Sequence, residues 1–259
     1  MPIQDTPVCL ITGSATGIGA ACARKFARHG WHVALSYLDA VTLAEARAVT
    51  AACQAAGAQT LLLPLDVRDD AACQRLAQAA LQRWGRIDAL VNCAGTTRFI
   101  AHADLAALDA AEFQRTYDVN VIGAYQMVRA CSESLRAGGH GSIVNITSIG
   151  GVLGRGSSMA YAASKGALNT LTLALARSLA PQVRVNAIAP GFVDGGLPAR
   201  VLDAAEHAQV LALQTTASVL KRVSQPEEVA ALAWFLCTQA PGMTGEVLMM
   251  DNGLHLNAG

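Results

Sequence analysis

The chain has 259 residues, of which 53% are hydrophobic, and its 19 basic and 19 acidic residues give a formal net charge of zero. Such a chain can fill a sizeable core, and without excess charge it gives no sign of a nucleic-acid or anionic-membrane partner. The first residues, MPIQDTPV, lack the basic and apolar regions of a leader, and no apolar run is long enough to span a bilayer. We therefore expect a cytoplasmic protein that binds neither nucleic acid nor membrane.

The cysteines and histidines do not point to a redox or metal site. The seven cysteines are odd in number and include no C-x-x-C pair, so we expect them to be reduced and mostly buried. The six histidines show no H-x-H or H-x-x-x-H spacing near carboxylates, so no metal is expected. The chemistry must come from other side chains.

Short apolar runs alternate with alanine-rich helical stretches along the whole chain. The runs are the predicted strands, at residues 8–11, 33–37, 61–65, 89–92, 142–147, 184–188 and 247–250. Uniformly apolar runs of this length are typical of parallel strands that are covered on both faces. No linker or repeat divides the chain, so we predict one α/β domain over residues 1–259. It is a doubly wound domain of Rossmann type, with a seven-stranded parallel sheet flanked by helices on both faces.

A glycine-rich turn at residues 12–19 follows the first predicted strand and opens a helix. At these positions Gly13 would permit a tight turn, Gly17 would let the backbone approach a pyrophosphate, and Gly19 would let helix and strand pack closely. The N-terminus of the helix would add amide donors for the anion. We predict a dinucleotide site here, formed by Gly13, Thr16, Gly17, Ile18 and Gly19.

Tyr161 and Lys165 stand four residues apart in a helical stretch, thirteen residues after Ser148 at the end of the run SIVNITS. Residues i and i+4 of a helix lie one above the other, so we expect the Lys165 ammonium beside the Tyr161 phenol, where it favours the phenolate. A phenol normally titrates near pH ~10, and a lowered pKa would make it an acid or base of use near neutrality. The triplet predicts a hydride-transfer active site.

The stretch 194–220 has no clear secondary structure in the sequence. It follows the sixth predicted strand and precedes a helix that begins at Pro226. Long connections at a strand end are often functional, so this stretch is a candidate lid over a substrate site.

The motifs occur in an order that resembles a known family. In chain order they are the glycine turn, Asn92-Cys93-Ala94-Gly95, Asn120, Ser148, Tyr161, Lys165 and Pro190-Gly191. With these motifs the chain closely resembles the single-domain branch of the short-chain dehydrogenase/reductase family over essentially its whole length. Within that branch it is similar to the bacterial 3-oxoacyl-acyl-carrier-protein reductases and to related ketone and alcohol dehydrogenases.

The resemblance implies the roles of four catalytic residues. Tyr161 would be the general acid in carbonyl reduction and the base in alcohol oxidation. Ser148 would hydrogen-bond the substrate oxygen, and Lys165 would lower the phenol pKa and hold the nicotinamide ribose. Asn120 matches the family's asparagine that holds a water between the lysine and solvent.

The resemblance also implies further contacts to the dinucleotide. Asp66 matches the acid that contacts the adenine amino group, and Val67 stands beside it. Other residues would shape the sheet edge around the cofactor or approach the nicotinamide; they are Asn92, Ala94, Gly95, Pro190, Gly191 and Val193.

Two positions depart from the family's pattern. Cys93 replaces the second asparagine of Asn-Asn-Ala-Gly, and we expect little effect on function. Asp194 stands where a threonine usually contacts the nicotinamide carboxamide. An acid could accept a hydrogen bond from that amide, but it also brings negative charge close to the ring.

The choice between the two nicotinamide cofactors depends on the end of the second predicted strand. NAD enzymes place an acid there for the adenosine ribose hydroxyls, and this chain has Tyr37. At this position there is no carboxylate to repel a 2′-phosphate, and the nearest acid, Asp39, comes two residues later. The Ser36 and Tyr37 hydroxyls could hold the phosphate. However, Leu38 and Thr16 occupy places where NADP enzymes of this branch often have arginine. We expect NADP(H), with NAD(H) as the alternative.

The predicted activity is hydride transfer between a nicotinamide cofactor and a ketone or secondary alcohol, with a 3-oxoacyl-type carbonyl reductase first. The small-molecule substrate would lie against residues 149–155, Phe192 and the candidate lid, with Arg98 and Arg155 as the nearby cations. One alternative is an NAD-dependent sugar, polyol or steroid alcohol dehydrogenase. Another is a catalytically idle nucleotide-binding sensor or scaffold, which the complete catalytic set disfavours. The resemblance also implies a homotetramer that packs through 109–135, 158–179 and the last strand.

Overall fold

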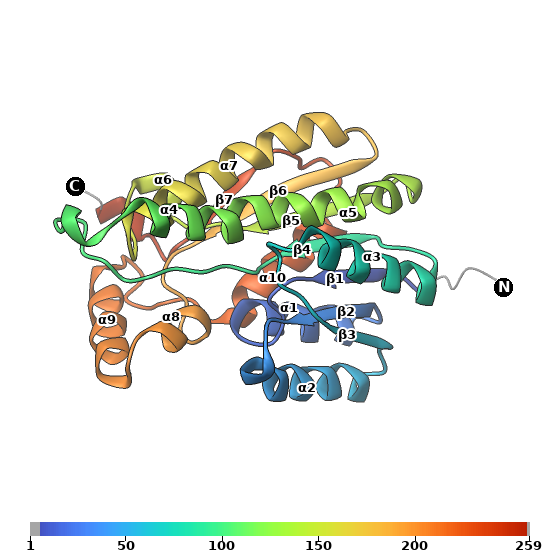
Figure 1. The fold of residues 1–259 in the computed structure, drawn as a ribbon, viewed down its shortest axis with the longest axis horizontal. Helices are drawn as coiled ribbons and strands as arrows, with labels where there is room; N and C mark the ends of the chain where they lie inside the picture. The colour runs from blue at the N-terminus through green and yellow to red at the C-terminus, as the bar shows by residue number, and fades with distance from the viewer. Residues whose placement is uncertain (1–5, 258–259) are drawn as a thin grey trace.

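The computed structural model describes residues 6–257, so the first five residues of the sequence and the last two of the predicted domain lie outside it. Its strands are β1 (Val8–Ile11), β2 (His32–Tyr37), β3 (Thr60–Pro64), β4 (Ala89–Asn92), β5 (Gly141–Ile146), β6 (Val183–Pro190) and β7 (Val247–Met250). All pair in parallel, in the order β3-β2-β1-β4-β5-β6-β7 (Figure 1). The predicted seven-stranded Rossmann-type sheet is confirmed.

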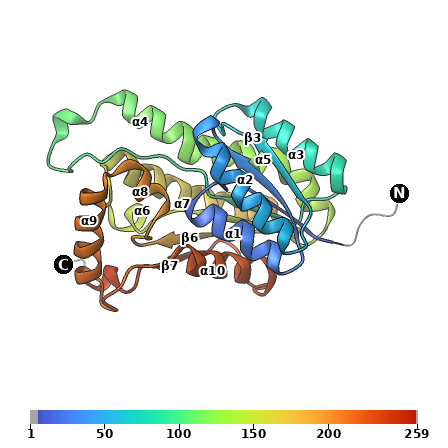
Figure 2. The ribbon, with the colours of Figure 1, turned by 90° about the horizontal axis from the view of Figure 1, so that it is seen from below.

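Helices cover both faces of the sheet (Figures 1 and 2). On one face lie α1 (Gly17–Arg28), α2 (Ala40–Ala55) and α10 (Pro226–Thr238). On the other lie α3 (Asp70–Trp84), α5 (Ala124–Ala137) and α7 (Met159–Leu179). The order of the strands reverses between β1 and β4, so the loops after these two strands diverge there. In open α/β sheets, ligands bind at such a switch point, outside the carboxyl ends of the strands.

The sheet separates two hydrophobic cores, and β1 shows why its sequence is apolar throughout. Cys9 and Ile11 belong to the core under α1 and α10, whereas Val8 and Leu10 belong to the core under α3 and α5. Successive side chains of a strand point to opposite faces, so a strand that is covered on both sides has no polar position.

The remaining elements lie mostly toward the end of the sheet where the strands terminate. They are the 3-10 turns η1 (Leu105–Ala107) and η3 (Leu254–Asn257), the helices α4 (Ala110–Tyr117) and α6 (Gly150–Leu153), and a π-helical segment, η2 (Asp118–Gly123). The segment η2 joins α4 to α5 in one long rod.

The candidate lid contains two helices, α8 (Gly196–Val201) and α9 (Ala204–Ala217). Neither helix has a buried residue, so the lid contributes nothing to either core. Figure 2 places both helices at the end of the sheet where the strands terminate, with α8 the nearer of the two to α1. The lid touches the glycine turn through one backbone contact, between Gly196 and Gly17.

Candidate active site

The glycine turn after β1 is packed too closely to accept side chains. A Cβ on Gly19 would lie 2.3 Å from the Gly13 carbonyl oxygen, and one on Gly13 would lie 2.9 Å from the Ala94 Cα. Gly13 and Gly17 have φ angles of +62° and +52°, which favour glycine. The tight turn and the close approach of helix α1 that we predicted are therefore present.

The start of α1 fits an anionic group such as a pyrophosphate. Its N-cap, Thr16, makes no side-chain cap, and its first turn has no acidic residue. Amide donors of the first turn therefore keep their capacity to bind an anion. Ile18 turns inward and packs against the core under α1. Gly17 faces the lid, because a Cβ there would lie 2.7 Å from the Gly196 Cα.

Ser36, at the end of β2, holds the glycine turn in place. Its backbone N–H donates to the Ser14 hydroxyl over 2.8 Å, and its own hydroxyl accepts from the Gly13 N–H over 3.2 Å. Ser36 is buried, so its hydroxyl serves the turn and does not face solvent. The expectation that it holds a phosphate stays a prediction. Tyr37 next to it is half-buried and pairs with Pro64 of β3.

The loop after β4 is fixed to the loop after β1 by one hydroxyl. Thr12 Oγ1 accepts from the N–H groups of both Cys93 and Ala94, each over 3.0 Å. The Asn92 side chain is buried and donates to Asn145 Oδ1 over 3.0 Å, which ties β4 to β5. The two loops of the switch point are thus joined across it.

The predicted catalytic residues meet at the ends of β5 and α7. The Ser148 and Tyr161 hydroxyls are hydrogen-bonded to each other, and Ser148 Oγ also accepts from the Gly150 N–H over 3.0 Å. Lys165 is buried, and its Nζ donates to the Ile146 carbonyl over 2.8 Å. The same Nζ lies 5.7 Å from the centroid of the Tyr161 ring. The three side chains therefore surround one small volume, as their spacing predicted.

Burial sets the proton affinities of this group. It raises the pKa of Tyr161 to about 12, against the smaller effect of the Ser148 hydrogen bond, and it lowers the pKa of Lys165 to about 8. We expected Lys165 to lower the pKa of Tyr161. In this structure the pKa of Tyr161 is raised instead, because the loss of solvation outweighs the other contributions to it. At neutral pH the phenol therefore carries its proton.

Asn120 lies in η2 with its amide fully engaged, and its exposed fraction is 1%. Its Oδ1 accepts from the Thr96 N–H over 2.8 Å, and its Nδ2 donates to the Thr96 carbonyl and to Ser164 Oγ, each over 3.0 Å. Ser164 Oγ donates in turn to the Tyr161 carbonyl over 2.8 Å. A Cβ on Gly95 would lie 3.5 Å from Asn120 Oδ1 and 3.7 Å from Lys165 Nζ. Asn120 therefore sits beside the catalytic lysine.

An ion pair that the sequence analysis missed supports this arrangement. Arg115 Nη2 donates to Glu112 Oε1 and Arg115 Nη1 donates to Thr96 Oγ1, over 2.6 and 2.7 Å. The Arg115 hydrogen bond holds the pKa of the buried Glu112 carboxyl below its usual range. The i, i+3 spacing of this pair on α4 was its signal in the sequence, but only the fold shows that it reaches Thr96.

The other predicted cofactor residues line the same edge of the sheet. Asp66 follows β3, and Arg68 Nη2 donates to its Oδ2 over 2.6 Å, so its carboxylate already has a partner. Val67 beside it is buried against Gly123. At the end of β6, the Pro190 carbonyl accepts from the Ile149 N–H over 2.9 Å, which places Pro190 next to the Ser148 turn.

The segment after β6 leads from the sheet into the lid. The Gly191 N–H donates to the Met250 carbonyl over 3.0 Å, and Val193 pairs with Ser224. Asp194, which departs from the family's pattern, lies with its Oδ1 3.6 Å from His207 Nε2 of α9. When protonated, that imidazole balances the negative charge that Asp194 brings to this edge.

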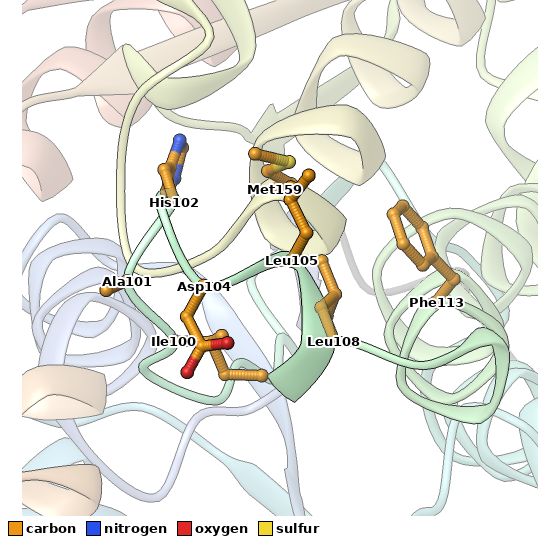
Figure 3. A pocket seen from close by; sticks show the side chains of 8 residues that line it. All are labelled: Ile100, Ala101, His102, Asp104, Leu105, Leu108, Phe113 and Met159. Atoms are coloured by element: carbon orange, nitrogen blue, oxygen red, sulfur yellow. The ribbon is translucent and has the colours of Figure 1, made fainter.

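An apolar pocket of about 130 Å³ lies outside the predicted substrate wall (Figure 3). Its lining comes from the loop before α4, from Phe113 of α4 and from Met159 at the start of α7. None of the predicted catalytic residues lines it. Of the two cations that we expected near the substrate, Arg98 is exposed beside this loop.

Within residues 6–257 no group of three or more His, Cys, Asp or Glu side chains could hold a metal ion. All seven cysteines are free, and six of them are buried. Cys93 is half-buried, and the loss of solvation at its thiol raises the pKa of that thiol to about 11, so it is protonated at neutral pH. No described helix has the length and apolar character to cross a membrane.

A glycine-rich turn at the switch point, beside a Ser–Tyr–Lys group whose lysine is buried, is the arrangement of a nicotinamide-dependent oxidoreductase that acts on alcohol or ketone groups. A sequence family described as enoyl-(acyl carrier protein) reductase matches residues 13–255. The structure is similar to that of a Burkholderia xenovorans protein described as a short-chain dehydrogenase/reductase, with a TM-score of 0.91, 51% identity and coverage of 98% and 99% of the two chains. The chain belongs to the short-chain dehydrogenase/reductase family.

Three relatives show the range of substrates in this family. One relative is the protein from Streptomyces violaceoruber that is named granaticin polyketide synthase ketoacyl reductase 2. The chain is 38% identical to it over 97% of both chains. It is 33% identical to 3-oxoacyl-[acyl-carrier-protein] reductase of Synechocystis, over 98% of this chain and 99% of the relative. It is also 33% identical to L-fucose dehydrogenase of Mus musculus, over 97% of this chain and 89% of the relative.

The buried position of Lys165 predicts an unusual titration. Its amine should lose its proton with a midpoint near pH 8, because burial lowers the pKa to about 8 from 10.5. Nitrogen NMR on lysine-labelled protein measures this directly, since the chain contains only Lys25, Lys165 and Lys221. A Lys165→Met variant assigns the signal. A midpoint near 10.5 for Lys165 would show that the ammonium is solvated.

The packing of Gly17 predicts a loss of dinucleotide affinity in Gly17→Ala. The new Cβ would meet the Gly196 backbone, and φ of +52° adds strain of about 1–3 kcal/mol. We expect affinity to fall at least about tenfold in calorimetry, equivalent to about 1.4 kcal/mol. Gly30→Ala is the matched control, because Gly30 has φ of +80° but open space around it. Equal affinities in the two variants would exclude the turn from the binding site.

Proposed function

We propose that this protein is a carbonyl reductase that uses NADP(H) and acts on 3-oxoacyl-type or related ketones. The observation that carries the proposal is the Ser148–Tyr161 hydrogen bond beside the buried Lys165. Two hydroxyls at one point can hold a carbonyl oxygen, and one of them has a proton to give. The ketoacyl and 3-oxoacyl reductases among its relatives support this substrate class.

The chain's own residues supply the proton and the orientation, and the bound dinucleotide supplies the hydride. The Ser148 hydroxyl donates to the substrate oxygen and stabilises the negative charge that develops on it. Tyr161 gives its phenolic proton to that oxygen, and the C–O group becomes an alcohol. Because burial raises the pKa of Tyr161 to about 12, the phenol carries a proton at neutral pH and can act as the acid in carbonyl reduction.

In the proposed reaction, Lys165 and Asn120 support Ser148 and Tyr161. The Lys165 ammonium, charged below pH about 8, orients the nicotinamide ribose and favours the phenolate that remains after proton transfer. Asn120 lies between Thr96 and Ser164, next to Lys165, and keeps the loop after β4 in place beside the catalytic helix. The glycine turn and the start of α1 hold the pyrophosphate, and Asp66 and Val67 border the adenine.

The candidate lid, residues 194–220, would close over the substrate. Its helices bury no residue, which is the property expected of a segment that moves, because few contacts must break. Phe192 lies at its base, with its ring centroid 5.9 Å from that of His207. Together with the segment 149–155, these two side chains would give one wall of the proposed substrate site an apolar and a polar group.

A sugar or polyol dehydrogenase is the second candidate. The Asp194–His207 pair favours it, because two adjacent polar groups suit a substrate with several hydroxyls. L-fucose dehydrogenase is among the relatives at this level of identity. A panel of 3-oxoacyl thioesters, cyclic ketones, L-fucose and L-rhamnose, tested with both cofactors, separates the two candidates. Turnover of the sugars alone would overturn the 3-oxoacyl proposal.

The proton role of Tyr161 predicts that Tyr161→Phe lowers turnover by roughly 10² to 10⁴. Dinucleotide affinity and thermal stability should change little, because the ring remains. Tyr125→Phe is the control, since it removes the same atom from an exposed tyrosine of α5. Rates are measured under conditions where chemistry is limiting. A Tyr161→Phe enzyme with more than half of the wild-type turnover would exclude Tyr161 as the acid.

We also infer a homotetramer, whereas a cytoplasmic location stays a prediction from the sequence. Large apolar side chains are exposed along the rod of η2 and α5, at Ile122 and Tyr125, and on α7 at Leu173. Met249 of β7 is exposed at the edge of the sheet. These are the helices and the strand expected at the interfaces, and their cover by other copies would remove apolar surface from water.

Light scattering at micromolar concentration tests the assembly. We expect four times the 26.8 kDa mass of one chain. Tyr125→Glu should lower the mass, because it places a charge in the proposed interface. The exposed Glu227→Gln on α10 is a control that alters charge outside that face. A monomer mass for the wild-type protein would end the proposal.

A further inference from the structure

The end of β2 is expected to contact the adenosine 2′ position of a bound dinucleotide. Among the described residues, this strand end has no cation that is available to bind a phosphate. Leu38 is 56% exposed and apolar. Asp39 caps α2, with its Oδ1 accepting from the Thr42 N–H over 3.0 Å. Arg68, at the end of the neighbouring β3, is held by Asp66 through several hydrogen bonds. From these residues alone, nothing would attract a 2′-phosphate.

The lid brings a cation to this place. Helix α8 begins at Gly196, whose backbone touches Gly17 of the glycine turn. Arg200 follows four residues later, about 6 Å along the helix axis at 1.5 Å per residue. The glycine turn is itself tied to the end of β2 through Ser36. An arginine in the last turn of α8 is thus within reach of the residues that follow β2.

The effect of the Arg200 charge on Asp39 is consistent with this placement of Arg200. Hydrogen bonds from Thr42 lower the pKa of the Asp39 carboxyl, and the Arg200 guanidinium adds a smaller decrease. Arg200 therefore lies close enough to Asp39 for their charges to interact. Among residues 6–257 none of the ion pairs within 4.0 Å involves Arg200, so its guanidinium has donors to offer.

We propose that Arg200 of the lid binds the adenosine 2′-phosphate and so sets the preference for NADP(H); this rests on the proposed function as a dinucleotide-dependent enzyme. A guanidinium offers planar paired donors that match a phosphate, which NAD(H) lacks at this position. The same charge offsets Asp39, whose carboxylate would otherwise repel the phosphate. The lid then determines which of the two cofactors is preferred, and it does so only when α8 lies against the glycine turn.

The test is a pair of affinities, for NADPH and for NADH, measured by calorimetry on the wild-type full chain and on Arg200→Met. Wild-type protein should bind NADPH more tightly. Arg200→Met should weaken NADPH at least tenfold and change NADH less than twofold. Arg200→Lys should fall between the two, because a lysine keeps the charge but not the paired donors. Arg28→Met, at an exposed arginine in the last turn of α1 outside the proposed interfaces, controls for net charge.

Three results would overturn the proposal. Wild-type protein that binds NADH as tightly as NADPH would remove the preference that Arg200 is meant to explain. Equal losses of both cofactors in Arg200→Met would make the residue a general lid contact. A selective loss of NADPH in Arg68→Met, with none in Arg200→Met, would transfer the role to β3. If wild-type protein bound neither cofactor, the proposed function itself would fail, and these outcomes are therefore distinguishable.

Discussion

The backbone contact at the switch point between β1 and β4 is the constraint on which the site depends. The chain passes from β1 into α1 through a turn in which Gly19 meets the Gly13 carbonyl and Gly13 meets Ala94. The Thr12 hydroxyl then holds the amides of the β4 loop. Because these contacts leave no room for side chains, the two loops can be displaced only together. The dinucleotide cradle is rigid for this reason.

From that contact a series of hydrogen bonds leads to the catalytic helix. The β4 loop continues to Thr96, which holds both ends of the Asn120 amide, and Asn120 holds Ser164 on α7. Arg115 and Glu112 support the start of this series from α4. The cofactor cradle and the proton donor thus belong to one connected set of groups, although they lie far apart in the sequence.

The sequence predicted best what depends on local pattern. Apolar runs identified every strand, and the spacing of Ser148, Tyr161 and Lys165 identified a group that the structure brings together. It did not predict α8 and α9, because helices without a buried residue have no amphipathic signal. It also could not give the direction of the Tyr161 pKa shift, which depends on burial by distant segments. Nothing in the sequence indicated that the Ser36 hydroxyl would point inward, either.

The buried lysine also limits how stable the fold can be. Folding moves an ammonium out of water and gives it a carbonyl partner, but no described carboxylate forms an ion pair with it. Because burial lowers the pKa from 10.5 to about 8, this cost is full below pH 8 and declines as the pH rises to 10.5. At neutral pH the chain therefore gives up part of its folding stability to keep a charge where the reaction occurs, a compromise between stability and activity.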